Sequence, residues 1–282
     1  MSALRWASIA VLAHRGSPDR TAPAVLSNAA VPSSGDSKLS NGDSRPGMIK
    51  ENTVAAFVEA LRLGADGVEL DVRLGADGAL VVHHDPYIDG VGLISELMVG
   101  DLPEWVPLLG LAIDACGAMT VNIELKTDLS PLAPPLTPDP DPDQIPDRAE
   151  GAREGIDRLV RQVVDAVNER GARGRSVVSS FSLSALDAIR AIDPRIPTGW
   201  LTRSHYDQVQ ALACVIDRGH SALHPPGDVV TSELVARAHD QGVDVCTWTV
   251  DDPSRMVELA SMGVDSLITN DVAAALRTLR RS

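Results

Sequence analysis

The chain has 282 residues, and 44% of them are hydrophobic, which is enough to bury a large core. Acidic residues outnumber basic ones by 39 to 25, so the formal net charge at pH 7 is −14. This charge argues against a general nucleic-acid binder, because such proteins present a basic face to the phosphates. No stretch approaches the roughly 18 apolar residues that a membrane span requires, so we expect no stable membrane anchor.

Short β-like runs alternate with helix-like runs along the chain. The predicted strands cover Ile9–Ala13, Gly67–Val72, Leu80–His83, Thr120–Leu125, Ser176–Ser180, Gly199–Thr202, Ala222–Leu223, Val243–Val250 and Ser266–Thr269. Between or after them, apolar residues recur at helical spacing. These residues are Val54, Phe57, Val58 and Leu61, then Ile156, Leu159, Val160, Val163, Val164 and Val167, and finally Val272, Ala275, Leu276 and Leu279.

Strands that alternate with helices predict parallel βαβ units and an α/β fold. About eight such units in a chain of this length fit a TIM (β/α)8 barrel, with a doubly wound open sheet as the alternative. Neither a G-x-G-x-x-G pattern nor a P-loop follows the first strand, which weakens the alternative. We therefore expect one barrel domain over residues 1–282.

Two stretches interrupt the alternation. Ser17–Lys50 is rich in Ser, Pro, Gly, Ala and Asn, and Thr127–Asp147 is dominated by Pro and Asp. Neither has the periodicity that buries a core, so we expect loop insertions at 17–50 and 127–147 that are partly disordered. Each follows a strand with polar residues, which predicts a place at the catalytic face of the barrel. There they act either as lids or as passive surface loops.

The three cysteines, Cys116, Cys214 and Cys246, lie far apart and form no C-x-x-C pair. This spacing indicates buried thiols in a reducing compartment rather than a disulfide framework or a zinc site. We therefore expect a cytoplasmic protein.

Polar side chains concentrate where predicted strands end. Because successive strand side chains point to opposite faces, Glu69 and Asp71 share one face, and Asn122, Glu124 and Lys126 share a face of another strand. Any one of the carboxylates alone could be an ordinary ion-pair partner. Three that converge are better explained by one bound divalent cation, and an all-oxygen ligand set suits Mg²⁺ or Ca²⁺ rather than zinc.

Two histidines lie beside these carboxylates in the predicted barrel. His14 and Arg15 follow the first strand, and His84 follows the third. A lone histidine at a strand end is usually a polar rim residue, but this set suits attack on a phosphodiester. Cations neutralise the phosphoryl oxygens, and imidazoles transfer protons near their own pKa. We expect the adjacent His83 to face away, in a packing role, because strand side chains alternate.

An ordered series of short motifs spans residues 13–271. The series is Ala13-His14-Arg15-Gly16, Glu51-Asn52-Thr53, Val68-Glu69-Leu70-Asp71-Val72, Val82-His83-His84-Asp85-Pro86, Asn122-Ile123-Glu124-Leu125-Lys126, Ser179-Ser180-Phe181, Trp248-Thr249-Val250 and Gly263-Val264-Asp265. Any one of these motifs is unspecific. In this order, however, they resemble the glycerophosphodiester phosphodiesterase family, which folds as a TIM barrel.

The resemblance implies a role for each candidate residue. The implied residues are the acid/base pair His14 and His84, the metal ligands Glu69, Asp71 and Glu124, the phosphate-contacting Arg15 and Lys126, the glycerol-pocket residues Phe181 and Trp248, and Glu51, which orients Arg15 or supports the metal. The implied reaction is metal-dependent hydrolysis of a glycerophosphodiester to sn-glycerol 3-phosphate and an alcohol. In the implied mechanism, the glycerol 2-hydroxyl attacks phosphorus and water opens the resulting cyclic intermediate. The substrate would be a small molecule of lipid and glycerol metabolism.

The sequence departs from the family pattern at two places. The segment between Gly16 and Glu51 is long, and Lys50 stands where a proline is usual, which bears on substrate choice. Asn270 takes a place that is usually acidic. We expect the second change to matter less, because the set of carboxylates is complete.

Three other functions are compatible with parts of the sequence. A lysophospholipase D acting on lysolipids would use the same site. A non-catalytic phosphoester-binding barrel would lack a histidine or a carboxylate, and none is missing here. A structural or partner-binding protein would instead depend on the acidic, Pro-rich loop. The sequence specifies neither the head group, nor the metal, nor the oligomeric state.

Overall fold

The computed structural model describes residues 9–18, 49–127 and 150–280. Most of the two predicted loop insertions, 17–50 and 127–147, lies outside these residues, so the choice between lid and passive loop stays a prediction. Within the described ranges, no helix combines the length and apolar character needed to span a bilayer.

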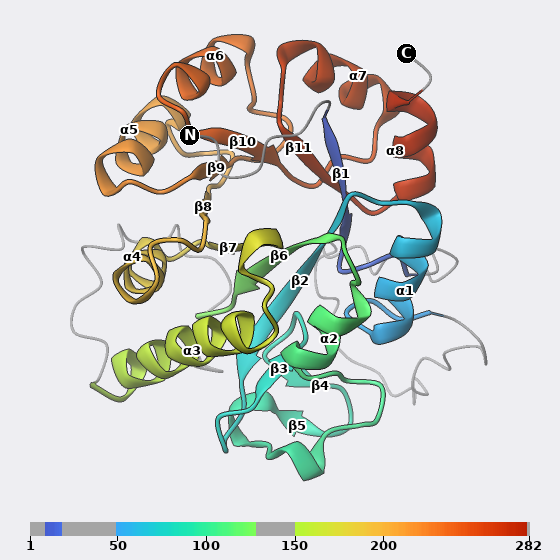
Figure 1. Ribbon diagram of the computed structural model, residues 1–282, viewed down its shortest axis with the longest axis vertical. Coiled ribbons are helices and arrows are strands. Elements are labelled where there is room, and N and C mark those ends of the chain that lie inside the picture. The colour runs from blue at the N-terminus through green and yellow to red at the C-terminus, as the bar shows by residue number, and fades with distance from the viewer. Residues whose placement is uncertain (1–8, 19–48, 128–149, 281–282) are drawn as a thin grey trace, which may run out of the picture.

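Eight parallel strands of the described chain close into a barrel (Figure 1). They are β1 (Ala10–His14), β2 (Gly67–Leu74), β6 (Thr120–Leu125), β7 (Ser176–Ser180), β8 (Thr198–Leu201), β9 (Ala222–His224), β10 (Asp244–Thr247) and β11 (Ser266–Thr269). Closure occurs at β1, which pairs in parallel with both β2 and β11. The predicted TIM barrel is therefore confirmed, and the open doubly wound sheet is wrong.

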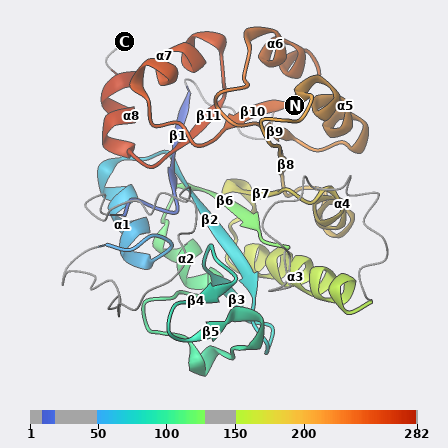
Figure 2. The same cartoon turned by 180° about the vertical axis from the view of Figure 1, so that it is seen from behind.

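Helices alternate with these strands and surround them in both views (Figures 1 and 2). They are α1 (Val54–Leu63), α2 (Leu109–Ala115), α3 (Glu150–Glu169), α4 (Leu183–Ile192), α5 (Gln208–Arg218), α6 (Ser232–Asp240), α7 (Pro253–Met262) and α8 (Val272–Leu279). Side-chain oxygens of Thr53, Ser182, Asp207, Thr231, Asp252 and Asp271 accept hydrogen bonds from first-turn amides of six of these helices. Such caps satisfy backbone donors that have no partner within the helix.

The helix predicted from the spacing of Val54, Phe57, Val58 and Leu61 is α1, but only Phe57 of these four residues is buried. Val54, Val58 and Leu61 are 41%, 49% and 44% exposed, whereas Ala56 and Ala60 are fully buried beside Phe57. Small alanine side chains let this helix approach the barrel closely, and the larger aliphatic residues fall on its outer side. The long stripe of α3 is predicted correctly, since its residues from Leu159 to Val167 supply much of the core between helix and barrel.

The third predicted strand is real but is not a barrel strand. β3 (Leu80–Val82) runs antiparallel to β2, which extends beyond the mouth of the barrel. The hairpin brings the chain back toward the carboxylates, and the His83 amide donates to the Asp71 carbonyl at 3.0 Å. His84 is thereby delivered by a returning strand rather than by a βα unit.

A small satellite follows this hairpin, at the bottom of Figure 1. It contains the hairpin of β4 (Tyr87–Ile88) and β5 (Gly92–Leu93) and the 3₁₀ turns η1 (Ile94–Glu96) and η2 (Val99–Asp101). Its own core consists of Val81, Ile88, Ile94 and Val106. A further 3₁₀ turn, η4 (Arg173–Arg175), precedes β7. The periodicity of the sequence did not predict these short elements.

All three cysteines are free. Cys116 and Cys246 are buried, as predicted, and burial raises the pKa of each thiol to about 12. Cys214 is exposed on α5, so the prediction of a buried thiol is wrong there. The helix buries Ala211, Leu212 and Val215, and Cys214 falls on its exposed side.

The turn after β1 brings the chain against the start of α1. Gly16 has a φ of +81°, and a Cβ at this position would lie 2.7 Å from the Cβ of Ala56. Only glycine combines that conformation with so close an approach. The turn holds Arg15, whose amide donates to Glu69 and whose Nε lies 3.2 Å from Asp71, so its shape also bears on the site.

We predict that Gly16→Ala destabilises the fold far more than Gly90→Ala. Gly90 has a similar φ of +73°, but a methyl group at this position would have nothing within 4 Å. Both variants bear the left-handed strain of roughly 1–2 kcal/mol, whereas only Gly16→Ala adds overpacking of about 1–3 kcal/mol. Urea unfolding of the two variants measures the difference. Equal losses would contradict the close contact with α1.

Candidate active site

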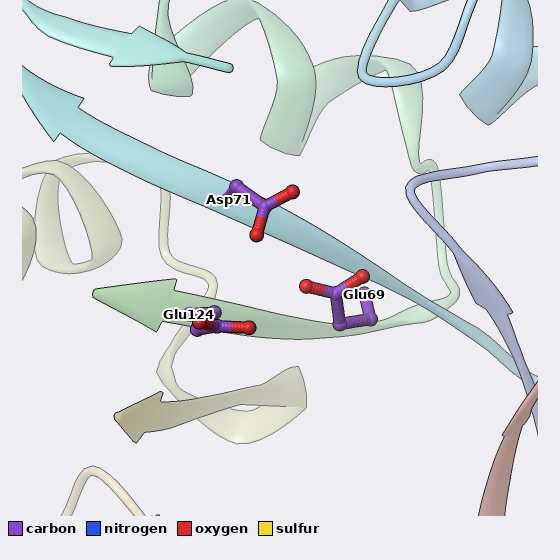
Figure 3. Close-up of side chains that lie close together, drawn as sticks. All are labelled: Glu69, Asp71 and Glu124. Carbon is purple, nitrogen blue, oxygen red and sulfur yellow. The ribbon is translucent and has the colours of Figure 1, made fainter. Parts of the chain in front are cut away.

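Three carboxylates converge at the mouth of the barrel (Figure 3). Glu69 and Asp71 come from β2 and Glu124 from the adjacent β6, where Asp71 and Glu124 are register partners. One oxygen of each lies within 4.8 Å of the others, and no residue of the three is more than 8% exposed. The two-residue period of the strands therefore does bring this predicted set together.

Two cations lie among these carboxylates. Lys126 Nζ is 2.9 Å from Asp71 Oδ1 and also contacts Glu124. Arg15 Nε is 3.2 Å from Asp71 Oδ2, and Arg15 Nη1 is 2.8 Å from Glu51 Oε1. Both basic groups thus gather around Asp71, while the half-exposed Glu51 holds the outer end of the guanidinium.

Glu69 is the least compensated carboxylate. The Arg15 amide donates to its Oε2 at 3.1 Å, but its buried Oε1 has no hydrogen-bond partner among the described residues. Burial, followed by the charges of Asp71 and Glu124, raises the pKa of Glu69 well above its usual range. An uncompensated buried oxygen of this kind is where another positive charge would bind.

The other two carboxyl groups differ because of their neighbours. Burial opposes ionisation of Asp71, but Lys126 and Arg15 outweigh it and bring the pKa of Asp71 below its usual range. Burial raises the pKa of Glu124, although Lys126 opposes the shift. The cluster fits a hard divalent cation, because all three donors are carboxylate oxygens and Glu69 Oε1 has no hydrogen-bond partner among the described residues.

His14 lies at the end of β1, between β2 and β11. Its Nδ1 is 2.6 Å from Asn270 Oδ1, and its Nε2 is 3.9 Å from Glu69 Oε2. Burial, and then the charge of Arg15, lower the pKa of this imidazole. The ring therefore has one nitrogen on a neutral amide and the other toward the carboxylates.

His84 is held in a different way. Its Nδ1 lies 2.7 Å from Asp85 Oδ1, and its backbone carbonyl accepts from Arg73 Nε at 2.8 Å. Burial, and then Lys126, lower the pKa of His84. The neighbouring His83 instead lies near the indole of Trp105, with ring centroids 6.1 Å apart.

The two predicted pocket aromatics also meet. Phe181 directly follows β7 and Trp248 directly follows β10, and their rings pack edge to face with centroids 5.6 Å apart. Trp248 Nε1 donates to the His224 carbonyl at 2.8 Å, and the guanidinium of Arg203 lies 4.6 Å from the Phe181 ring. Both rings are partly exposed at the carboxyl ends of barrel strands, where a ligand can reach them.

Sequence reasoning did not assign four residues that build the site. Asn52 donates through Nδ2 to Asp71 Oδ2 at 2.7 Å. The other three are Arg73, Asp85 and Asn270, with the contacts given above. Arg73 could have been found, because it is in phase with Glu69 and Asp71 on β2. The contact of Asn270 with His14 spans 256 positions and has no local signal.

A family model described as the glycerophosphoryl diester phosphodiesterase family matches residues 14–105 and 141–274. The chain belongs to this family. The resemblance inferred from the motifs is thus confirmed, as is the enzyme class, a phosphoric diester hydrolase. Glu124 and Lys126 lie between the two matched segments, so their place in the site is given by the structure.

Proteins similar to this chain align with it over most of its length. A glycerophosphodiester phosphodiesterase of Caldanaerobacter subterraneus subsp. tengcongensis is 28% identical over 260 residues, covering 85% of this chain and 96% of the relative. The fold is similar to that of a glycerophosphodiester phosphodiesterase from Parabacteroides distasonis, with a TM-score of 0.69, 22% identity and coverage of 97% and 98% of the two chains. An Oleispira antarctica phosphodiesterase in complex with the product sn-glycerol-3-phosphate has a TM-score of 0.70, 22% identity and 98% coverage of both chains.

We predict that Glu69→Gln stabilises the metal-free protein at pH 8 and not at pH 4. The folded pKa of Glu69 is raised above its unfolded value of about 4.3. Wild-type stability therefore falls as pH rises from that value toward the folded pKa, because only the unfolded chain has released the proton. We therefore expect a gain in the free energy of unfolding at pH 8 and none at pH 4, where the carboxyl is protonated in both states.

Urea unfolding in chelator at both pH values measures this gain. Glu59→Gln is the control, because Glu59 is a half-buried carboxylate whose pKa is lowered by its hydrogen bond with Arg62. It should show no gain at pH 8. A pH-independent effect of Glu69→Gln would contradict the raised pKa.

Proposed function

We propose that this protein hydrolyses glycerophosphodiesters to sn-glycerol 3-phosphate and an alcohol, with one divalent cation, Mg²⁺ or Ca²⁺. The observation that carries the proposal is the meeting of three carboxylates, two cations and two histidines at one barrel mouth. Family membership and the name of the Caldanaerobacter relative support the substrate class. The Oleispira phosphodiesterase, whose complex holds sn-glycerol-3-phosphate as product, supports the same product for this chain.

Glu69, Asp71 and Glu124 would hold the cation, and Arg15 and Lys126 would contact the phosphate. A bound Mg²⁺ or Ca²⁺ supplies Lewis-acid stabilisation of charge on the phosphoryl oxygens. Glu51 contacts Arg15 Nη1 and Asp71 contacts Arg15 Nε, so the guanidinium is held in place beside the carboxylates. Lys126 contributes a point charge beside Asp71.

His14 and His84 would transfer the protons. As the glycerol 2-hydroxyl forms a bond to phosphorus, one imidazole takes the hydroxyl proton and the other gives a proton to the departing alkoxide. A cyclic phosphodiester and the free alcohol result. Water then opens the ring, and the two imidazoles exchange roles, so both return to their initial protonation states. The lowered pKa of each imidazole keeps a neutral base available near pH 7.

Phe181 and Trp248 would form the wall against which the glycerol backbone packs. Their edge-to-face contact fixes both rings, and a fixed apolar wall favours the carbon side of a polyol. The product belongs to glycerol and lipid metabolism. The three free cysteines support a cytoplasmic location, where thiols stay reduced.

Chelation is expected to abolish hydrolysis, and Mg²⁺ or Ca²⁺ to restore it. The physical reason is that the buried oxygens of Glu69, Asp71 and Glu124 lack one compensating charge. Release of glycerol 3-phosphate from glycerophosphocholine and glycerophosphoethanolamine, measured with and without EDTA, is the assay. Full turnover after dialysis against excess chelator would refute metal dependence, and absence of glycerol 3-phosphate from all substrates tried would refute the substrate class.

Each of His14→Ala and His84→Ala should lower kcat by about 10²–10⁴-fold, the usual contribution of an acid or base. The KM should change far less, because neither ring supplies the main phosphate contact. His83→Ala is the matched control, since His83 is adjacent in sequence but packs near Trp105. A loss for His83→Ala equal to that for His84→Ala would show that the wrong imidazole has been assigned.

A further inference from the structure

Asn270 joins His14 to a second carboxylate outside the metal-binding cluster. The Asn270 Oδ1 atom lies 2.6 Å from His14 Nδ1, and the Asn270 Nδ2 donates to Asp251 Oδ2 at 2.7 Å. The other oxygen of Asp251 accepts from the Asn270 amide at 2.8 Å and from Thr269 Oγ1 at 2.9 Å. Asp251 therefore binds the backbone and the side chain of the same asparagine.

This arrangement determines which nitrogen of His14 carries hydrogen. A carboxylate only accepts hydrogen bonds, so the NH₂ of Asn270 must face Asp251. The amide oxygen then faces His14 Nδ1, and two acceptors cannot share a hydrogen bond. Nδ1 must be the protonated nitrogen of the neutral ring. The lone pair is left on Nε2, on the side of Glu69.

We propose that Asp251 and Asn270 are positioning residues that hold His14 in its Nδ1–H tautomer, with Nε2 available for proton transfer. This inference rests on the proposed function, in which His14 moves a proton of the substrate. Asn270 acts through His14, and Asp251 acts through Asn270. Neither residue has to touch the substrate for the assignment to hold.

The two candidate catalytic imidazoles are oriented by different acceptors. His84 Nδ1 faces a carboxylate directly, that of Asp85. His14 Nδ1 faces a neutral amide, and the carboxylate of Asp251 lies one residue further from the ring. An interposed amide orients the ring without adding a full negative charge next to Glu69, which is already the least compensated group of the site.

Asp251→Asn should reverse the tautomer. The Asp251 Oδ1 position meets two donors, so the oxygen of the new amide stays there and its NH₂ takes the place of Oδ2. That NH₂ would oppose the NH₂ of Asn270, so the side-chain amide of Asn270 rotates and presents a donor to His14 Nδ1. Nδ1 must then accept, and the neutral imidazole carries its hydrogen on Nε2. The lone pair is thereby removed from the reacting side.

The double variant Asp251→Asn with Asn270→Asp should restore the original tautomer. The amide introduced at 251 then donates to the carboxylate introduced at 270, whose second oxygen accepts from His14 Nδ1. The same number of charges is present as in the wild type, in exchanged places. A third variant, Asn270→Leu, removes the acceptor altogether.

The test combines kinetics with ¹⁵N NMR of histidine-labelled enzyme at a pH where the imidazoles are neutral. Asp251→Asn and Asn270→Leu should each lower kcat by about 10–100-fold, as for other residues that orient an active-site histidine, with KM nearly unchanged. The double variant should recover kcat to within about threefold of wild type, since contacting residues are not additive. The His14 resonances, identified by their loss in His14→Ala, should show hydrogen on Nδ1 in wild type and the double variant, and on Nε2 in Asp251→Asn.

Asp265→Asn is the matched control, because Asp265 pairs with His239 at 2.9 Å and precedes β11, whereas Asn270 follows it. This variant should keep the wild-type kcat. A wild-type His14 with hydrogen on Nε2 would overturn the proposal, as would unchanged kcat in Asp251→Asn and Asn270→Leu, or failure of the double variant to recover. If no glycerophosphodiester is hydrolysed, the proposed function fails while the NMR result still decides the tautomer.

Discussion

The mutual repulsion of Glu69, Asp71 and Glu124 is the constraint on which the rest of the site depends. Their oxygens lie within 4.8 Å of one another in a buried place, where water screens the charges little. Arg15 and Lys126 both contact Asp71, and Lys126 also contacts Glu124, so Glu69 has no side-chain cation of its own among these contacts. Burial, and then the charges of Asp71 and Glu124, raise the pKa of Glu69, and a cation fits beside it.

The backbone next to this cluster adopts conformations that contacts with the cluster stabilise. Arg15 and Asn52 are non-glycine residues with φ values of 54° and 55°. Such residues cost about 1–3 kcal/mol each and persist where the surrounding contacts compensate. Here the Arg15 amide donates to Glu69, and the side chain of the buried Asn52 binds both the amide and the carboxylate of Asp71. The connection from β1 to α1 is thus tied to β2 by the groups that the site uses.

Local sequence predicts several strands of the barrel correctly. Thr120–Leu125, Ser176–Ser180 and Ser266–Thr269 match their strands residue for residue, because each is a short buried run with clear boundaries. Of the apolar stripe predicted on α1 only Phe57 is buried, because hydrophobicity ranks valine above alanine while close packing on a barrel favours the smaller side chain. The direction of β3 was also missed, because a pattern that predicts a strand does not specify its partner.

The site residues also separate into those that local sequence predicts and those that only the fold brings together. Strand alternation alone predicts that Glu69 and Asp71 share a face and that Glu124 lies in phase with Lys126, because side-chain direction in a strand follows from the backbone. The hydrogen-bond partners of the two histidines differ in how far they lie from the histidine in sequence. Asp85 adjoins His84 in sequence, whereas Asn270 meets His14 only through the fold.

Closure of the barrel is what creates that second contact. β1 pairs with β2 on one side, where His14 is the register partner of Glu69, and with β11 on the other, where Ala13 is the partner of Thr269. The next position along both strands brings His14 beside Asn270. If β1 were the edge of an open sheet, its histidine would have only one of these neighbours. The ring that gives the barrel its stability is therefore also the element that places one candidate catalytic imidazole between a carboxylate cluster and the amide that orients it.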